Sequence, residues 1–204
     1  AVKNRFGSLE IGVYEIGDAG LKDIPNASEL FLSERPVNAS GTVVVPVMEG
    51  TRPILVEVQA LVGSSSYQNA RRTTNGIDLN RLQLLLAVLE KRAGLLLGGS
   101  DAFVKVAGGV KIDEPAVDLG LAVALASSYR DCPVNPYTVI IGEVGLAGEV
   151  RAVSHMEQRI RESRRMGFRR AIVPVSAEKV HTEPGFSLLG APTLNDALNI
   201  VLGR

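Results

Sequence analysis

Apolar residues recur along this chain with two spacings, one typical of strands and one typical of helices. Two runs rich in β-branched residues, TVVVPVM (42–48) and PILVEVQALV (53–62), flank the short polar segment EGTR. This arrangement predicts a β-hairpin. From Leu79 onward the spacing changes to i, i+3, i+4 and i+7, which predicts a long helix with one apolar face. The residues on that face are Leu82, Leu85, Leu86 and Leu89.

In the last hundred residues, predicted strands and helices alternate. We expect strands at DAFVKVA (101–107), YTVIIG (137–142) and RAIVPV (170–175), since each is a short apolar run. We expect helices in the segments 110–128, 154–168 and 193–203. In the second of these, Met156, Ile160 and Ser163 form a narrow inner stripe. Strands dominate before these elements, so the order predicts a mixed α/β fold built in layers.

Polar segments mark the expected loops and an N-terminal arm. After a strand at LEIGVYEI (9–16), residues 17–28 are expected to form turns and loop, with a short helix at ASELFL (27–32). The segment GSSSYQNARRTTNG (63–76) is expected to be a polar loop. We therefore divide the chain into an extended arm, residues 1–40, and a layered α/β domain, residues 41–204.

Composition limits the classes of function. The chain is 46% hydrophobic and 22% charged with no formal net charge, which excludes a strongly basic protein but not a basic face. One cysteine, Cys132, and two histidines exclude an internal disulfide framework and give no credible metal site, and we expect a cytoplasmic protein. We expect no membrane span. Neither a P-loop motif nor a G-x-S-x-G motif is present, and the chain begins at Ala1 rather than Met, so we expect a segment upstream.

The segment VKIDEPAVDLGLAVALASS (110–128) has the pattern of a buried helix with a polar entrance. Asp113 and Glu114 lie where negative charge favours a helix N-terminus, and Pro115 suits a first helical turn. The residues that follow are apolar nearly all round, which is typical of a fully buried helix. Further along, Ser154 to Glu157 reads S-x-x-E, which predicts a capping box at the next helix.

Two motifs within this pattern carry a family resemblance. EPAVDLGLAVALAS followed by GEVGLAGEVRAV makes residues 40–204 resemble the proteolytic domain of Lon proteases. The resemblance implies a serine nucleophile in a G-P-S-A-G turn and a lysine that activates it. These positions fall at Ala116 and Glu157, so both reactive groups are replaced and the resemblance implies a degenerate active site with no catalytic residues.

A second resemblance covers nearly the whole chain and depends on its first residues. The motif Lys3-Asn4-Arg5-Phe6-Gly7, followed by ARRTTNGIDLNRLQLLLAVLEKR (70–92) and the two Lon-like motifs, resembles the bacterial RadA (Sms) family. The resemblance implies that residues 1–40 adjoin a RecA-like ATPase core that lies upstream. ATP, magnesium and a zinc finger belong to that upstream part, and no cofactor is expected in this chain. It also implies a hexameric homo-oligomer that binds single-stranded and branched DNA and drives branch migration. Lys3 and Arg5 would act at the ATP site between subunits, unless the motif is only a flexible linker.

Arginines are the candidate DNA contacts, because the guanidinium fork donates paired hydrogen bonds to phosphate. Seven lie between Arg151 and Arg170, against two glutamates, and others lie in or beside the predicted polar loop. The candidates are Arg71, Arg72, Arg81, Arg159 and Arg165. The alternative is that the helical arginines form only a solvated surface. Nine Phe and Tyr residues and no Trp argue against base stacking as the main binding mode.

Two further functions stay open at this stage. The chain can be a purely structural oligomerisation domain, or a peptidase that uses another serine such as Ser100, Ser127 or Ser128. None of these serines has a recognisable partner base in the sequence. We therefore expect a scaffold and DNA-binding module of a RadA-type DNA repair and recombination protein, without proteolytic activity.

Overall fold

The computed structural model describes residues 13–17, 20–24, 28, 32, 35–36, 38–65, 69–182 and 184–203. The motif from Lys3 to Gly7 and most of the short helix expected at 27–32 lie outside the described residues. In the arm, strand β1 (Val13–Gly17) pairs antiparallel with β2 (Gly20–Ile24). The expectation of loop throughout 17–28 is therefore wrong, because backbone pairing in this hairpin extends to Ile24.

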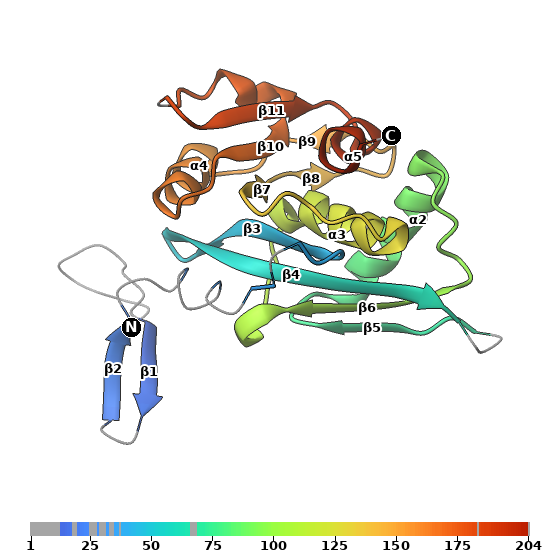
Figure 1. The fold of residues 1–204 in the computed structure, drawn as a ribbon, viewed down its shortest axis with the longest axis horizontal. Coiled ribbons are helices and arrows are strands. Elements are labelled where there is room, and N and C mark those ends of the chain that lie inside the picture. Colours follow the sequence, from blue (N-terminus) through green and yellow to red (C-terminus); the bar gives the residue numbers. More distant parts are fainter. Residues whose placement is uncertain are drawn as a thin grey trace.

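A seven-stranded sheet runs through the rest of the chain in the order β11-β10-β7-β3-β4-β6-β5 (Figure 1). Its strands are β3 (Thr42–Glu49), β4 (Arg52–Ser64), β5 (Arg72–Asn75), β6 (Ser100–Val106), β7 (Thr138–Ile140), β10 (Arg170–Pro174) and β11 (Ser187–Ala191). Pairing is antiparallel on both sides of β4 and parallel between the remaining neighbours. The predicted β3–β4 hairpin is confirmed, and Gly50 provides the positive φ that its tight turn requires.

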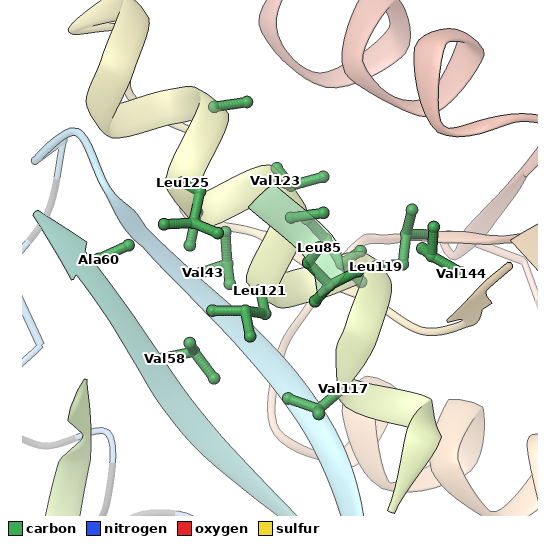
Figure 2. Packing of buried hydrophobic residues seen from close by; sticks show 14 of the residues in the cluster. Val43, Val58, Ala60, Leu85, Val117, Leu119, Leu121, Val123, Leu125 and Val144 are labelled. Atoms are coloured by element: carbon green, nitrogen blue, oxygen red, sulfur yellow. The ribbon is translucent and has the colours of Figure 1, made fainter. Parts of the chain in front are cut away.

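Three helices cover one face of this sheet. They are α2 (Leu79–Ala93), α3 (Asp118–Arg130) and α5 (Leu194–Leu202). The predicted apolar face of α2 is confirmed, since Leu82, Leu85, Leu86 and Leu89 are all buried. Helix α3 lies at the centre of the main core, where its side chains pack against β3, β4 and α2 (Figure 2). Gly120 permits this approach, because a Cβ there would lie 2.2 Å from Val45 Cγ1.

The opposite face carries helix α4 (Met156–Arg165) and a second, smaller core. Ile160 of α4 and Phe168 pack there against apolar residues of β3, β4, β7 and β10. A small hairpin of β8 (Glu143–Val144) and β9 (Val150–Arg151) lies beside the start of α3. The predicted mixed α/β layered fold is therefore confirmed.

The expectation of a polar loop throughout residues 63–76 is wrong at both ends of the segment, where the described residues form strand. Strand β4 continues to Ser64, and β5 pairs with β6 in parallel from Arg72↔Ala102 to Asn75↔Lys105. β5 is the last strand at one edge of the sheet, and its sequence is polar. An edge strand pairs with a neighbour on one side only, so polar side chains are common there. Its hydrogen bonds come from the backbone, so the apolar pattern could not reveal it.

Candidate functional site

The entrance to α3 is where the Lon-like resemblance places a nucleophile. A 3₁₀ turn, Pro115–Val117, leads into the helix, and Pro115 occupies its first position as expected. Ala116 is only 2% exposed. Its carbonyl accepts a hydrogen bond from the Gly142 N–H at 3.2 Å, and the Gly142 carbonyl accepts one from the Leu119 N–H at 3.0 Å. The residue at the nucleophile position is therefore a buried alanine held by backbone bonds.

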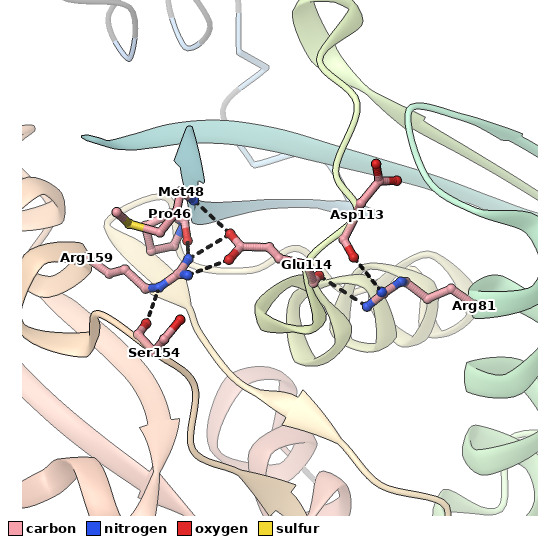
Figure 3. Close-up of polar contacts among 7 residues, drawn as sticks. All are labelled: Pro46, Met48, Arg81, Asp113, Glu114, Ser154 and Arg159. Atoms are coloured by element: carbon pink, nitrogen blue, oxygen red, sulfur yellow. Dashed lines mark hydrogen bonds and ion pairs between the residues drawn. The ribbon is translucent and has the colours of Figure 1, made fainter. Parts of the chain in front are cut away.

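Beside Ala116, a buried ion pair joins the entrance to α4. The Arg159 side chain is fully buried, and its guanidinium donates to both carboxylate oxygens of Glu114 and to the carbonyl oxygens of Pro46 and Ser154 (Figure 3). One oxygen of Glu114 also accepts the Met48 N–H at 2.8 Å. The Glu114–Arg159 pair thus connects β3, the α3 entrance and α4.

A second arginine holds the same segment from the side of α2. Arg81 donates to the carbonyl oxygens of Asp113 and Glu114 at 2.9 and 3.1 Å, and forms an ion pair with Asp118. Burial raises the pKa of the Asp118 carboxyl, against the lowering effect of Arg81. Backbone carbonyls and carboxylates therefore occupy the donors of Arg81.

The DNA contacts expected of Arg81 and Arg159 need correction. The side chain of Arg159 has no exposed surface, and that of Arg81 is only 22% exposed. A phosphate group cannot reach Arg159 in this conformation. Both arginines hold the α3 entrance instead, and neither is carried into the DNA-binding proposal below.

Glu157, at the position of the Lon lysine, lies on the exposed side of α4. The expected capping box is wrong: α4 begins at Met156, after His155 in the left-handed region (φ 58°), and no side chain caps it. The Ser154 carbonyl instead accepts the Arg159 Nε–H at 2.9 Å, so the buried arginine determines the conformation before the helix.

Glu157 also borders a surface cavity of about 350 Å³ between α4 and the segment 180–182. Its ionisable lining residues are Glu157, Arg161, Arg164 and His181. A second cavity, of about 290 Å³, lies on the other side of the α3 entrance, with the Arg81–Asp118 pair in its wall and Leu84 and Leu146 beside it. The first has basic side chains in its wall and the second has an apolar border.

The two arginines expected on a free polar loop both have structural partners. Arg71 forms an ion pair with Asp101 at 3.1 Å, and its backbone N–H donates to the same carboxylate, which lowers the pKa of Asp101. Arg72 begins β5 and donates to the carbonyl oxygens of Leu97, Gly98 and Ser100. Arg72 is therefore held in the fold by its bonds to these carbonyl oxygens rather than free on a polar loop. Arg71 still has a side chain that is 58% exposed.

Arg165 is the candidate that α4 presents to solvent. Its side chain is 51% exposed and forms two hydrogen bonds with Glu162, at 2.8 and 2.9 Å. Arg161, one turn earlier, is also exposed, as is Arg169 beyond the helix. Several arginines of this segment are therefore exposed, as expected. Arg159 instead lies at the centre of a buried network of hydrogen bonds.

Glu114 and Arg159, each two residues from an expected catalytic position, are in contact, whereas Ala116 is buried and Glu157 is exposed on α4. Sequence reasoning missed the Glu114–Arg159 pair, although one signal was available. Arg159 adjoins Ile160 and precedes Ser163 by four residues, so it falls on the inward side of α4. Among the described residues, no group of three His, Cys, Asp or Glu side chains is placed to hold a metal ion. None of the described helices combines the length and apolarity that crossing a bilayer requires.

Comparison with known proteins gives one family-model match over part of the chain and relatives that match nearly all of it. Residues 101–177 match a family model described as subunit ChlI of Mg-chelatase. The chain is 52% identical to the DNA repair protein RadA of Halalkalibacterium halodurans and 52% identical to that of Bacillus subtilis. Each match covers 100% of this chain and 45% of the relative. RadA of Streptococcus pneumoniae is also 52% identical, over 98% of this chain and 48% of its own length. The chain thus spans about half the length of the curated relatives it matches.

Proposed function

Because the chain belongs to the RadA family of DNA repair proteins, we propose that it is a scaffold and DNA-binding module within a longer recombination protein. The observation that carries this proposal is the combination of family membership with a filled active-site entrance. In place of a nucleophile and its base, the entrance contains Ala116 and the Glu114–Arg159 pair.

The module has no peptidase activity in this proposal. Ala116 has no atom that can attack a carbonyl group, and the carboxylate of Glu157 cannot replace the neutral lysine of a Ser–Lys pair. The neighbouring donors of Arg159 are already bonded to Glu114 and to two carbonyl oxygens. Support for a structural role comes from these bonds, which join three elements of the fold.

DNA binds through the exposed arginines of α4 and the segment after it. Arg161 and Arg165 are one helical turn apart and therefore lie on neighbouring parts of one helix face. Arg164 and His181 add basic groups in the adjoining cavity. Glu162 partly offsets this charge through its bonds to Arg165, so binding depends on phosphate outcompeting an exposed ion pair, which contributes about 0–1 kcal/mol.

For the longer protein we propose the remaining family properties. It assembles as a hexameric ring, binds single-stranded and branched DNA, and uses ATP and magnesium in an upstream ATPase core to drive branch migration. Lys3 and Arg5 contribute to ATP turnover at the subunit boundary, as a cation from a neighbouring subunit can stabilise the transferring phosphoryl group. Substituting Lys3→Ala in that protein should lower ATP turnover, and unchanged turnover would leave the motif as a linker.

The test for this chain is DNA binding by fluorescence anisotropy across a salt series. A double variant, Arg161→Ala with Arg165→Ala, should weaken binding to single strands and reduce the salt slope by about 1.4, or about 0.7 for each phosphate that is no longer neutralised. The control is Lys91→Ala with Arg130→Ala, which removes the same charge near the C-terminal ends of α2 and α3. Equal effects of both double variants would mean that DNA affinity depends only on the net charge of the chain and not on the positions of Arg161 and Arg165.

The second candidate function, a purely structural oligomerisation domain, predicts a different result. The chain would then form a stable oligomer by light scattering and bind no DNA at low salt. A fluorogenic peptide assay completes the set, since turnover that one serine substitution abolishes would contradict the absence of peptidase activity.

A further inference from the structure

Among the described residues, the second face of the sheet is left partly uncovered at β4, β6 and β5. Along β6, Ala102, Val104 and Val106 are buried in the core beneath α2 and α3. Successive side chains of a strand point to opposite faces, so Phe103 and Lys105 point away from those helices. Figure 1 shows α2 and α3 on one side of β4 and β6.

The strand register arranges the side chains of this face in rows. Phe103 lies between Leu61 of β4 and Thr73 of β5. In the next row, Lys105 lies between two side-chain amides, Gln59 of β4 and Asn75 of β5. Alternate residues along a strand are about 7 Å apart, so the two rows form a flat surface with an aromatic row beside a cationic row. We call these six residues the open sheet face.

The described residues leave this face partly accessible: Phe103 and Gln59 are half-buried, and the other four residues are exposed. Leu61 is 65% exposed, and Lys105, Thr73 and Asn75 are exposed as well. One step along β4, a Cβ on Gly63 would meet nothing within 4 Å. Leu61 and Phe103 thus place adjoining apolar surface in contact with water beside the cationic row.

The charges around Phe103 favour an anionic partner. The Arg71 guanidinium lies 5.7 Å from the centre of the Phe103 ring, and Lys105 follows in the next row. The acids of β4, β5 and β6 whose side chains point to this side are Asp101, which is 4% exposed and paired with Arg71, and Glu57, which is 2% exposed. The accessible charge of the open sheet face is therefore positive.

A partner for this face must present flat apolar rings, polar ring edges and negative charge together. A protein surface is a poorer match, because the centres of protein interfaces are depleted in lysine, and Lys105 lies within the open sheet face. Unpaired bases stack on aromatic side chains, amides bond to their edges, and the phosphates pair with cations. In a duplex, the faces of the bases are already covered by their neighbours.

We propose that the open sheet face binds single-stranded DNA, with an unpaired base stacked on Phe103 and a phosphate near Lys105. This inference rests on the proposed DNA-binding function and adds a second surface, distinct from the arginines of α4, that distinguishes single strands from duplex. In this proposal, base stacking contributes more to binding than the low number of aromatic residues suggests. One partly exposed aromatic ring on the sheet is enough to stack one base.

The experiment compares the affinities of Phe103 variants of the whole chain for labelled oligothymidylate and for a duplex of equal length. Phe103→Leu keeps an apolar side chain but has no ring, and should weaken single-strand binding about tenfold. It should leave duplex binding and the salt slope unchanged, since stacking releases no counterions. Phe103→Trp should bind single strands at least as tightly as the unsubstituted chain. Lys105→Ala should reduce the single-strand salt slope by about 0.7.

Tyr129→Ala is the matched control, because it removes an exposed aromatic ring from the last turn of α3 and should not change either affinity. Melting temperatures exclude unfolding as the cause of any loss. If the chain binds no DNA at all, the proposed function fails. If it binds and the Phe103 variants behave alike on single strands, only the stacking proposal is overturned. If Phe103→Leu changes the oligomeric state by light scattering and not the affinity, the face is an interface between copies, and the proposal is also overturned.

Discussion

Removing either partner of the Glu114–Arg159 pair should destabilise the chain far more than replacing both. The reason is burial: the Arg159 side chain has no exposed surface, and its guanidinium donates to four acceptor oxygens, two of them from Glu114. In Glu114→Ala, the positive charge stays buried without its counter-charge. The Met48 N–H also loses its acceptor.

The expected magnitude follows from the cost of an unpaired buried charge. Breaking a buried ion pair by removing one partner costs about 3–5 kcal/mol, whereas replacing both partners by apolar groups is often neutral. Glu114 has a side chain that is 24% exposed, so water can reach part of the site and the lower end of that range is the better expectation. For a chain of this size, about 3 kcal/mol corresponds to a decrease in melting temperature of about 6–12 °C.

The assay is a double-mutant cycle followed by thermal and urea unfolding. The variants are Glu114→Ala, Arg159→Met and the double substitution, with Glu157→Ala as the control on the exposed side of the same helix. We expect the double variant to be more stable than Glu114→Ala, with a coupling energy above about 1 kcal/mol. Single effects that add within about 0.5 kcal/mol would refute the idea that these residues stabilise the fold as a pair.

Three further outcomes follow from the contacts. Glu157→Ala should change the unfolding free energy by less than about 0.5 kcal/mol, because it removes no capping bond. A decrease near 1 kcal/mol in urea unfolding would instead show that Glu157 takes part in a capping box. Arg72→Ala should lower the unfolding free energy by about 1–2 kcal/mol, since three carbonyl oxygens lose a hydrogen-bond donor. An unchanged melting temperature would mean that these bonds do not stabilise the fold. Burial raises the pKa of Glu57, so its charged form destabilises the fold at neutral pH and the penalty fades as pH falls toward about 4. Glu57→Gln should therefore raise the melting temperature more at pH 7.5 than at pH 4, and an equal shift at both would contradict this interpretation.

The elements that the sequence predicted well are those whose burial follows a simple period. Leu82, Leu85, Leu86 and Leu89 of α2 all face one core, as their helical spacing predicts. β3 and β4 are apolar runs rich in β-branched residues on either side of a short polar turn, so their composition and the turn were enough to predict the hairpin. Strand β5 lacks such a signal. Its sequence is polar, and it becomes a strand only because β6 provides a backbone edge brought near by the α2 connection.

The sequence predicted where the entrance to α3 begins but not which residues contact one another there. The motif around Ala116 located the entrance to α3, and the structure places a buried turn there. Sequence distance concealed the rest, because Glu114 and Arg159 are 45 residues apart and no local pattern pairs them. Charge alone also misleads, because it groups Arg72 and Arg159 with exposed arginines as one class of DNA contacts. Only their partners, which depend on the tertiary fold, separate the buried arginines from the accessible ones.

The distinction between buried and accessible arginines changes which residues we expect to contact DNA. An arginine that already donates to carbonyl oxygens and a carboxylate gains little from a phosphate, because it would have to give up bonds of similar strength. Arg159 and Arg72 are in that position, whereas Arg161 and Lys105 are on the surface. Among the described residues, the two accessible cationic surfaces that we propose for DNA are therefore the exposed arginines of α4 and the open sheet face. A single strand that contacts both would pair its phosphates at α4 and stack a base at Phe103, whereas a duplex could use only the first. A difference in the effect of Phe103 substitutions between the two forms of DNA is thus the observation that distinguishes one basic surface from two.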